Sequence, residues 1–182
     1  MFHMKYHTRY IGVLTLCFLL LLHPIPVSAI GQAQQASPLN QQPAIEAEFE
    51  GVHLEIDIAT NVLKIFLNTQ LMYTFKVATG KNKTHTPLGK FRIVTKVEKP
   101  WYLPKNIAGG DPKNPLGTRW LGLDVPYTSG YKYGIHGTNN PYSIGGHVTQ
   151  GCIRLQNKQV EWLYQHIQIG TPVIIKDSSK TR

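Results

Sequence analysis

Residues Tyr133 to Leu155 read Y-G-I-H-G-T-N-N-P-Y-S-I-G-G-H-V-T-Q-G-C-I-R-L, and no other stretch says more about this protein. It holds His136 and, sixteen positions later, Cys152, which stands between a glycine and an Ile-Arg pair. The chain has two cysteines, and the other, Cys17, lies in an N-terminal apolar segment that we expect to be removed. A mature chain with one thiol cannot form an internal disulfide, which favours a chemical role for Cys152.

The same stretch resembles the catalytic signature of the L,D-transpeptidases, the YkuD-type domain of bacterial cell-wall enzymes. That signature reads H-G-T, a spacer and S-x-G-C-I-R, and residues 136–138 and 149–154 match it. Thr149 replaces the usual serine but keeps the hydroxyl, and Gln150 stands where many members carry a second histidine. Further matches between residues 51 and 176 are T-P-L-G-K-F from Thr86, N-P-L-G-T-R-W-L from Asn114 and G-T-P-V from Gly170.

The sequence predicts four segments. Residues 1–29 are typical of a secretory signal peptide, because Lys5 and Arg9 precede an apolar stretch, Ile11–Leu22, that is shorter than the roughly 20 residues of a membrane span. Residues 30–48 are rich in Gln, Ala and Pro and indicate a flexible linker. We expect a catalytic domain over residues 49–177 and a polar, basic tail over residues 178–182.

The charge of the chain is +9, which favours anionic partners such as the polymers of a cell-wall surface. The basic residues are spread along the chain, without the Lys/Arg runs typical of nucleic-acid binding, so no nucleic-acid partner is predicted. The exported chain is expected in the periplasm, in the cell wall or in the medium. Contact with a membrane is expected only through an uncleaved signal peptide.

Alternating and helical patterns predict a β-dominated mixed α/β domain. Leu54, Ile56 and Ile58 alternate with polar residues, as in a half-buried strand. Further strands are predicted over residues 62–67, 71–78, 91–97 and 173–176, and Pro- and Gly-rich loops over residues 100–130. One helix is predicted after Cys152, with Asn157 as its cap and an apolar stripe of Val160, Leu163, Tyr164 and Ile167. The resemblance implies the L,D-transpeptidase catalytic-domain fold, a sandwich-like meander of short strands with one main helix.

The predicted chemistry is nucleophilic attack by a thiolate. A free thiol has a pKa near about 8.5, so a base must take its proton at neutral pH, and His136 is the candidate. The resemblance supplies the contact between His136 and Cys152 and implies that the carbonyl of Gly137 orients the imidazole. The backbone N–H groups of Gly151 and Cys152 are candidates to stabilise the oxyanion of the tetrahedral intermediate.

Several residues near the motif are candidates for substrate binding, and a structural role stays open for each. Arg154 either holds a peptide carboxylate in a forked contact or forms an ion pair beneath the site. Thr149 either bonds near the thiolate or shapes its turn. The other candidates, which line the cleft or belong to the core, are Thr138, His147 and Trp120.

No metal and no cofactor are predicted. Histidine is a common metal ligand, and His85, His136 and His147 offer a conceivable zinc site. The short ligand spacings typical of zinc sites are nevertheless absent.

The resemblance implies a peptidoglycan L,D-transpeptidase that works on stem peptides as donor and acceptor. Cys152 would attack the carbonyl of the third residue of a tetrapeptide stem, release D-alanine and form a thioester. An amine would then take the acyl group, giving a 3→3 cross-link or a protein attached to the wall. Two alternatives stay open: an extracytoplasmic cysteine L,D-carboxypeptidase or endopeptidase, in which water resolves the thioester, and a catalytically silent wall-binding module.

Overall fold

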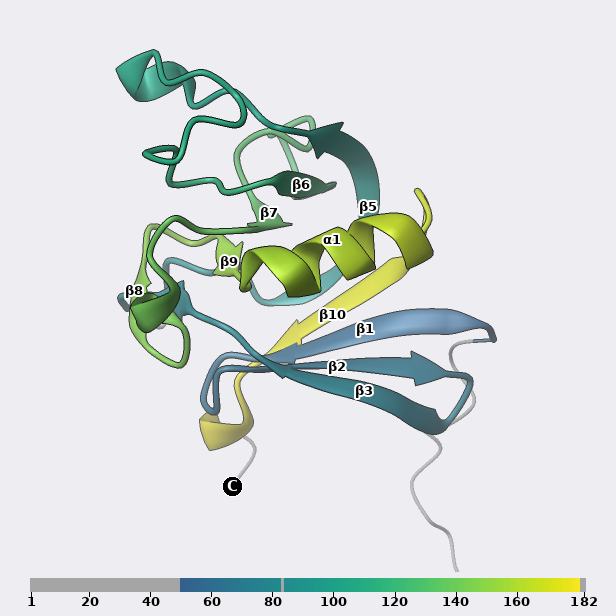
Figure 1. Ribbon diagram of the computed structural model, residues 1–182. Helices are drawn as coiled ribbons and strands as arrows, with labels where there is room; N and C mark the ends of the chain where they lie inside the picture. Colours follow the sequence, from purple (N-terminus) through teal and green to yellow (C-terminus); the bar gives the residue numbers. More distant parts are fainter. Residues whose placement is uncertain (1–49, 83, 181–182) are drawn as a thin grey trace, which may run out of the picture. The chain divides into compact units, whose positions relative to one another are not determined.

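The computed structural model describes residues 50–82 and 84–180, which belong to one compact unit. The predicted signal peptide and linker lie outside these described residues. Eight strands form the main sheet: β1 Val52–Asp57, β2 Val62–Leu67, β3 Gln70–Lys76, β5 Gly89–Glu98, β6 Arg119–Leu123, β7 Gly134–His136, β9 Ile153–Arg154 and β10 Pro172–Lys176 (Figure 1). Two short strands, β4 Thr79–Gly80 and β8 His147–Thr149, form a second sheet.

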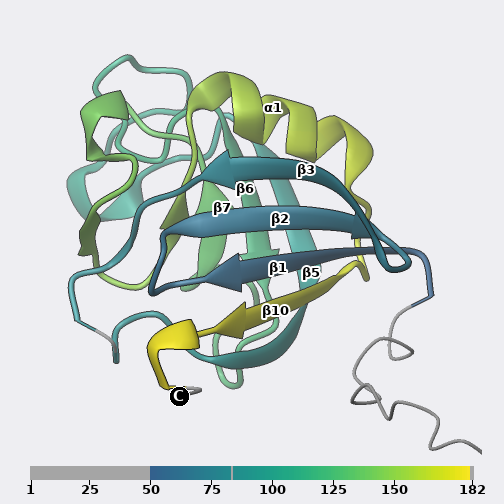
Figure 2. The same ribbon diagram turned by 90° about the horizontal axis from the view of Figure 1, so that it is seen from below.

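The order of strands in the main sheet is β3-β2-β1-β10-β5-β6-β7-β9. Strands β1, β2 and β3 form the antiparallel meander that the sequence predicts. The last strand, β10, enters between β1 and β5, parallel to the first and antiparallel to the second (Figure 2). The two halves of the sheet therefore meet at β10.

The sheet curls, so that its β1–β3 end and its β6–β7 end lie on either side of helix α1, Asn157–His166 (Figure 1). Trp162 of α1 packs its ring against Tyr73 and Phe75 of β3, while the helix also contacts β6 and β7. Apolar residues from both halves fill the space between them and are almost fully buried: Leu54, Ile56, Leu63, Ile93, Leu121, Ile135, Ile153, Leu155, Leu163 and Ile175.

The predicted β-dominated class is confirmed, and so is the single main helix after Cys152 within the residues described. The predicted helix cap is wrong by one residue. Asn157 is the first residue of α1, the capping position is Gln156, and no side chain caps the helix. The side chain of Asn157 points elsewhere, because its Oδ1 accepts a hydrogen bond from the backbone N–H of Thr138 at 3.1 Å. The start of the helix thereby holds the loop that follows β7.

Three 3-10 turns complete the described part: η1 Leu103–Lys105, η2 Pro141–Ser143 and η3 Ser178–Lys180. The last of them falls on the predicted polar tail, and Ser178 bonds the carboxylate of Asp57 through both its N–H and its hydroxyl. Between residues 50 and 180, apart from the undescribed position 83, no helix has the length and apolar character needed to cross a membrane.

Candidate active site

The two residues of the predicted nucleophile–base pair come from neighbouring parallel strands. His136 ends β7, and Cys152 directly precedes β9. The register sets Ile135 opposite Ile153 and His136 opposite Arg154. The same register places Cys152, the residue before β9, near Gly134 at the start of β7, on the strand that ends in His136.

The imidazole of His136 is fixed by a main-chain carbonyl. Its Nδ1 lies 2.6 Å from the carbonyl oxygen of Gly137, which can only accept, so Nδ1 carries the proton and Nε2 is the unprotonated nitrogen of the neutral ring. On one side the ring stacks on Trp120 of β6, with centroids 5.6 Å apart. A Cβ at position 137 would collide with Asn157 Oδ1 at the start of α1, so a larger residue there would have to displace that side chain.

Burial keeps this imidazole neutral. His136 is 4% exposed, and desolvation lowers its pKa to about 4, while the nearby charge of Arg154 acts in the same direction. The carbonyls of Gly137 and Leu116 oppose the shift without cancelling it. At neutral pH the ring is an acceptor at Nε2, which is the state that a general base needs.

The thiol of Cys152 lies against the segment that leads into β7. Its Sγ donates a hydrogen bond to the carbonyl of Lys132 at 3.4 Å. Burial raises the pKa of the thiol, while the backbone N–H of Gly134 and the charge of Arg154 work to lower it. Among the described residues Cys152 and His136 share no hydrogen bond, so the resting site holds a neutral thiol and a neutral imidazole.

The turn before the thiol is closed by its own residues. The hydroxyl of Thr149 donates to the carbonyl of Cys152 at 2.7 Å and accepts the N–H of Gly151 at 3.0 Å. Gly151 has φ +128°, and a Cβ there would collide with the carbonyl of His85, so this position admits only glycine. Thr149, 2% exposed, thus shapes the turn that presents Cys152.

Arg154 lies two residues beyond the thiol and is half-buried. Its backbone pairs with Ala78 in both directions, at 2.9 and 3.0 Å. The guanidinium has no ion-pair partner in the described part of the chain, and its buried Nε makes no hydrogen bond there. The structure therefore gives no partner for the ion pair that sequence reasoning left open.

The polar side-chain groups of the other predicted binding residues form hydrogen bonds with other groups of the protein. Thr138 is buried, and its hydroxyl accepts the N–H of Asn140 at 3.0 Å. Trp120 is 5% exposed and donates its indole N–H to the carbonyl of Gly130 at 2.8 Å. The ring of His147 on β8 bonds to Thr79 and Asn61. Within residues 50–180, leaving out position 83, no three His, Cys, Asp or Glu side chains gather to hold a metal ion.

Sequence reasoning did not find the main-chain groups around the thiol. The carbonyl of Lys132, the N–H of Gly134 and the carbonyl of His85 all border Cys152 or Gly151. Residue types do not show where backbone N–H and carbonyl groups will point. The glycines at 134 and 151 were the sole signal, because close backbone approach requires a residue without a side chain.

A family profile, YkuD, described as the L,D-transpeptidase catalytic domain, matches residues 51–175, which is more than half of the chain. The chain belongs to the L,D-transpeptidase catalytic-domain family. A relative from Bacillus subtilis, YqjB, which is named as a candidate L,D-transpeptidase, is 47% identical over 122 residues, covering 67% of this chain and 69% of its own length. Another candidate L,D-transpeptidase of that organism, YkuD, is 41% identical over 123 residues and covers 68% of this chain.

Solved L,D-transpeptidases share the fold. An L,D-transpeptidase from Mycobacterium smegmatis superposes with a TM-score of 0.54 at 22% identity, covering 69% of this chain and 58% of its own. The catalytic domain of the E. faecium enzyme gives a TM-score of 0.53 at 20% identity and covers 70% of this chain and 98% of its own. In the curated relatives, the chain spans about two thirds of the length: 69% of YqjB and 65% of YkuD.

The lowered pKa of His136 predicts how the rate depends on pH. Below a pH of about 4 the imidazole is protonated and cannot accept the thiol proton, so the rate of thiol acylation should fall through that value. Between about pH 5 and 7 the titration of His136 should cause no change in the rate of thiol acylation. NMR titration of the His136 ring tests the pKa independently of any substrate, and a midpoint near about 6.5, the ordinary value, would contradict the buried, neutral state.

Proposed function

We propose that this protein is a cysteine-dependent peptidoglycan L,D-transpeptidase that acts outside the cytoplasm. The observation that carries the proposal is the pairing of β7 with β9, because β7 ends in the neutral imidazole of His136 and β9 follows directly on the half-buried thiol of Cys152, the one free cysteine among the described residues. Family membership points to the same chemistry. The donor is a tetrapeptide stem of peptidoglycan, and the acceptor is an amine.

The reaction begins from neutral partners. As the sulfur of Cys152 attacks the carbonyl carbon of the third stem residue, His136 Nε2 takes the thiol proton. The bond between that carbon and the nitrogen of the terminal D-alanine then breaks, and His136 returns the proton to the leaving amine. An acceptor amine next attacks the thioester, gives up its proton to His136 and releases Cys152. The product is a 3→3 cross-link or a protein joined to the wall.

The oxyanion of each tetrahedral intermediate needs N–H donors. The N–H of Gly151 is already donated to Thr149 Oγ1. The N–H of Cys152 makes no hydrogen bond within the described residues, so we assign it as the donor to the oxyanion. In this assignment Gly151 serves through its backbone conformation, φ +128°, which turns the next N–H toward the site.

We assign Arg154 to the donor carboxylate. A half-buried guanidinium without an ion-pair partner among the described residues is suited to a carboxylate, which it can grip with two parallel hydrogen bonds. Arg154 also favours the thiolate, since its charge lowers the pKa of Cys152 and disfavours an imidazolium at His136. A stem peptide offers such a carboxylate on its terminal D-alanine.

Mass spectrometry of a purified stem tetrapeptide tests the function. After incubation with the protein we expect loss of D-alanine, a thioester on Cys152 and, with a second stem as acceptor, a dimer. Hydrolysis to the tripeptide without a dimer would instead identify an L,D-carboxypeptidase. An unchanged tetrapeptide with no acyl-enzyme would overturn the proposal and favour a silent wall-binding module.

Arg154→Lys separates the effect of the positive charge from the effect of the two parallel N–H donors of the guanidinium. Lysine keeps the positive charge but loses the planar pair of donors, so kcat/KM for the donor should fall roughly 10- to 100-fold, matching the 1.5–3 kcal/mol of a charged hydrogen bond. The midpoint of thermal unfolding should stay near that of the wild type. Arg154→Met, of similar length but uncharged, should in addition raise the pKa of Cys152, measured by iodoacetamide labelling against pH. A fall in unfolding midpoint that parallels the loss of activity in Arg154→Lys would show a structural role instead.

A further inference from the structure

A closed circuit of hydrogen bonds joins three side chains beside the candidate site. Thr79 Oγ1 donates to Asn61 Oδ1 at 2.5 Å, and it lies 3.0 Å from His147 Nδ1. Asn61 Nδ2 lies 3.2 Å from His147 Nε2 and donates to the carbonyl of Gly145 at 2.9 Å. Thr79 is 1% exposed and Asn61 4%, so two of the three members are out of reach of solvent.

The donors and acceptors fix a single arrangement of protons. The hydroxyl of Thr79 has one proton, which goes to Asn61, so His147 Nδ1 must carry a proton and donate it to Thr79. The amide nitrogen of Asn61 can only donate, so His147 Nε2 must accept. Every polar atom of the circuit is then satisfied, and both ring nitrogens of His147 are occupied within the protein.

The circuit holds the strand that leads to the thiol. Residues 77–81 pair along one edge with residues 145–149, through Gly145 N–H to Val77, Thr79 N–H to Gly146 and Lys81 N–H to Thr149. Along the other edge, Ala78 pairs with Arg154. The turn that carries Cys152 therefore passes around the segment 77–81, from one edge to the other. The position of the thiol depends on how firmly both edges are held.

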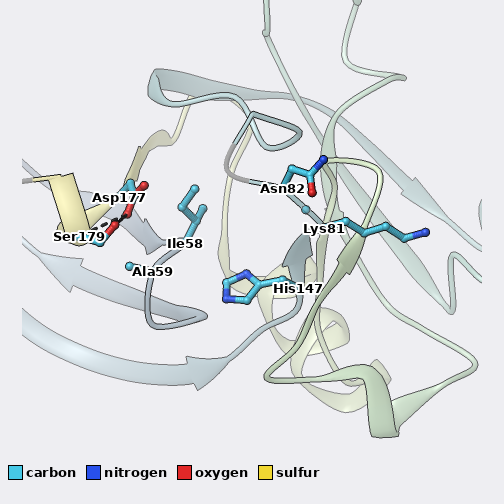
Figure 3. Close-up of a pocket in the computed structure, with 8 residues that line it drawn as sticks. Ile58, Ala59, Lys81, Asn82, His147, Asp177 and Ser179 are labelled. Atoms are coloured by element: carbon cyan, nitrogen blue, oxygen red, sulfur yellow. Dashed lines mark hydrogen bonds between the residues drawn. The ribbon is translucent and has the colours of Figure 1, made fainter.

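His147 also faces open space. It lines a cavity of about 460 Å³ together with Ile58, Ala59, Lys81 and Asn82 (Figure 3). Cys152 does not line this cavity, so the cavity lies apart from the reacting atoms. Both ring nitrogens are nevertheless engaged with Thr79 and Asn61.

We propose that the Asn61–Thr79–His147 circuit is a positioning device, which sets the turn 149–152 and thereby the rate at which Cys152 is acylated. The three residues act through β8 and the hydroxyl of Thr149, not by contact with a ligand. The inference rests on the proposed function in that it concerns the same thiol. Misplacement of a reacting group by about 1 Å can cost roughly 10²-fold in rate, so a weakened circuit has a measurable effect.

Thr79→Val is the test, because it removes both hydrogen bonds of the hydroxyl and keeps the shape of the side chain. We expect the rate of acylation by a stem tetrapeptide to fall at least roughly tenfold, with KM for the donor little changed, since Thr79 is buried. Thr79→Ser, which keeps the hydroxyl, should restore most of the rate. Ile175→Val in β10 controls for stability, since it removes a methylene group from the buried core and should leave acylation unchanged.

Asn61→Gly is a second variant that tests the circuit if Thr79→Val folds poorly. Asn61 has φ +53°, which glycine adopts without strain, so this change removes the amide and spares the turn. Its acylation rate should fall in the same way. Wild-type acylation rates in both variants, or equal losses in Thr79→Val and Thr79→Ser, would overturn the positioning role.

Iodoacetamide separates the failure of this inference from the failure of the proposed function. Alkylation of Cys152 needs no stem peptide, and its rate should also fall in Thr79→Val relative to the wild type. If the wild type forms no thioester with the tetrapeptide but alkylation still differs between the two, the function is wrong and the circuit stands. If the wild type forms the thioester and Thr79→Val matches it in both reactions, the circuit is wrong and the function stands.

Discussion

Cys152→Ala and Cys152→Ser are expected to abolish D-alanine release, transfer and the acyl-enzyme. The thiol is the one covalent nucleophile of the proposed reaction, so its removal deletes the pathway and not merely a contribution to it. Serine keeps the size of the side chain, but its hydroxyl is far less acidic, and a neutral imidazole with a pKa of about 4 is too weak a base to activate it.

The fold should survive both changes. The thiol makes one 3.4 Å hydrogen bond to the carbonyl of Lys132, and the bonds that shape the turn come from Thr149 and Gly151. Intact-mass measurement and the unfolding midpoint, taken on one preparation, check both halves of the expectation. More than a few per cent of wild-type turnover in Cys152→Ala would refute the assignment of the nucleophile.

His136→Ala is expected to lower the acylation rate by roughly 10²- to 10⁴-fold, the range for a positioned acid or base. The neutral ring must accept the thiol proton in the first step and return it to the leaving amine, so both half-reactions suffer. The residual rate should no longer show the acid limb near pH 4 that the wild type is expected to have. Single-turnover kinetics with the tetrapeptide measure the first step alone.

His166→Ala is the matched control for a lost imidazole. His166 is exposed at the end of α1, where its ring stacks on Trp162 at 4.2 Å, away from β7 and β9. We expect its acylation rate to equal that of the wild type. A loss of less than about fivefold in His136→Ala would mean that another group takes the proton.

Side-chain pattern predicted the elements of this fold because period-2 alternation reflects burial on one face. Leu54 and Ile56 on β1, and Val160 and Leu163 on α1, point into the same core. The pattern does not encode which strands become neighbours. Strand β10 could follow β5 or close on β1 with the same alternation, and the structure places it between them.

The candidate pair was found from motif spacing, whereas its surroundings were not. The bond from His136 to the Gly137 carbonyl agrees with what the family resemblance implied. The capping role expected of Asn157 failed because a tertiary partner, the N–H of Thr138, competes for the same side-chain oxygen. Such competition between local and distant partners cannot be read from a local pattern.

The place of β10 in the sheet bears on when the fold can be completed during synthesis. Its partners on β1 lie about 120 residues away in sequence, as in the pair Leu54 and Val173, so this closure is among the least local in the chain. Loop-closure entropy opposes such contacts until most of the sheet is ready. A growing chain that stops before Pro172 has both His136 and Cys152 but lacks the strand that pairs with both halves of the main sheet. Strand β10 is therefore the last strand of the main sheet to be synthesised, and we expect the complete sheet to form only after translation has passed it.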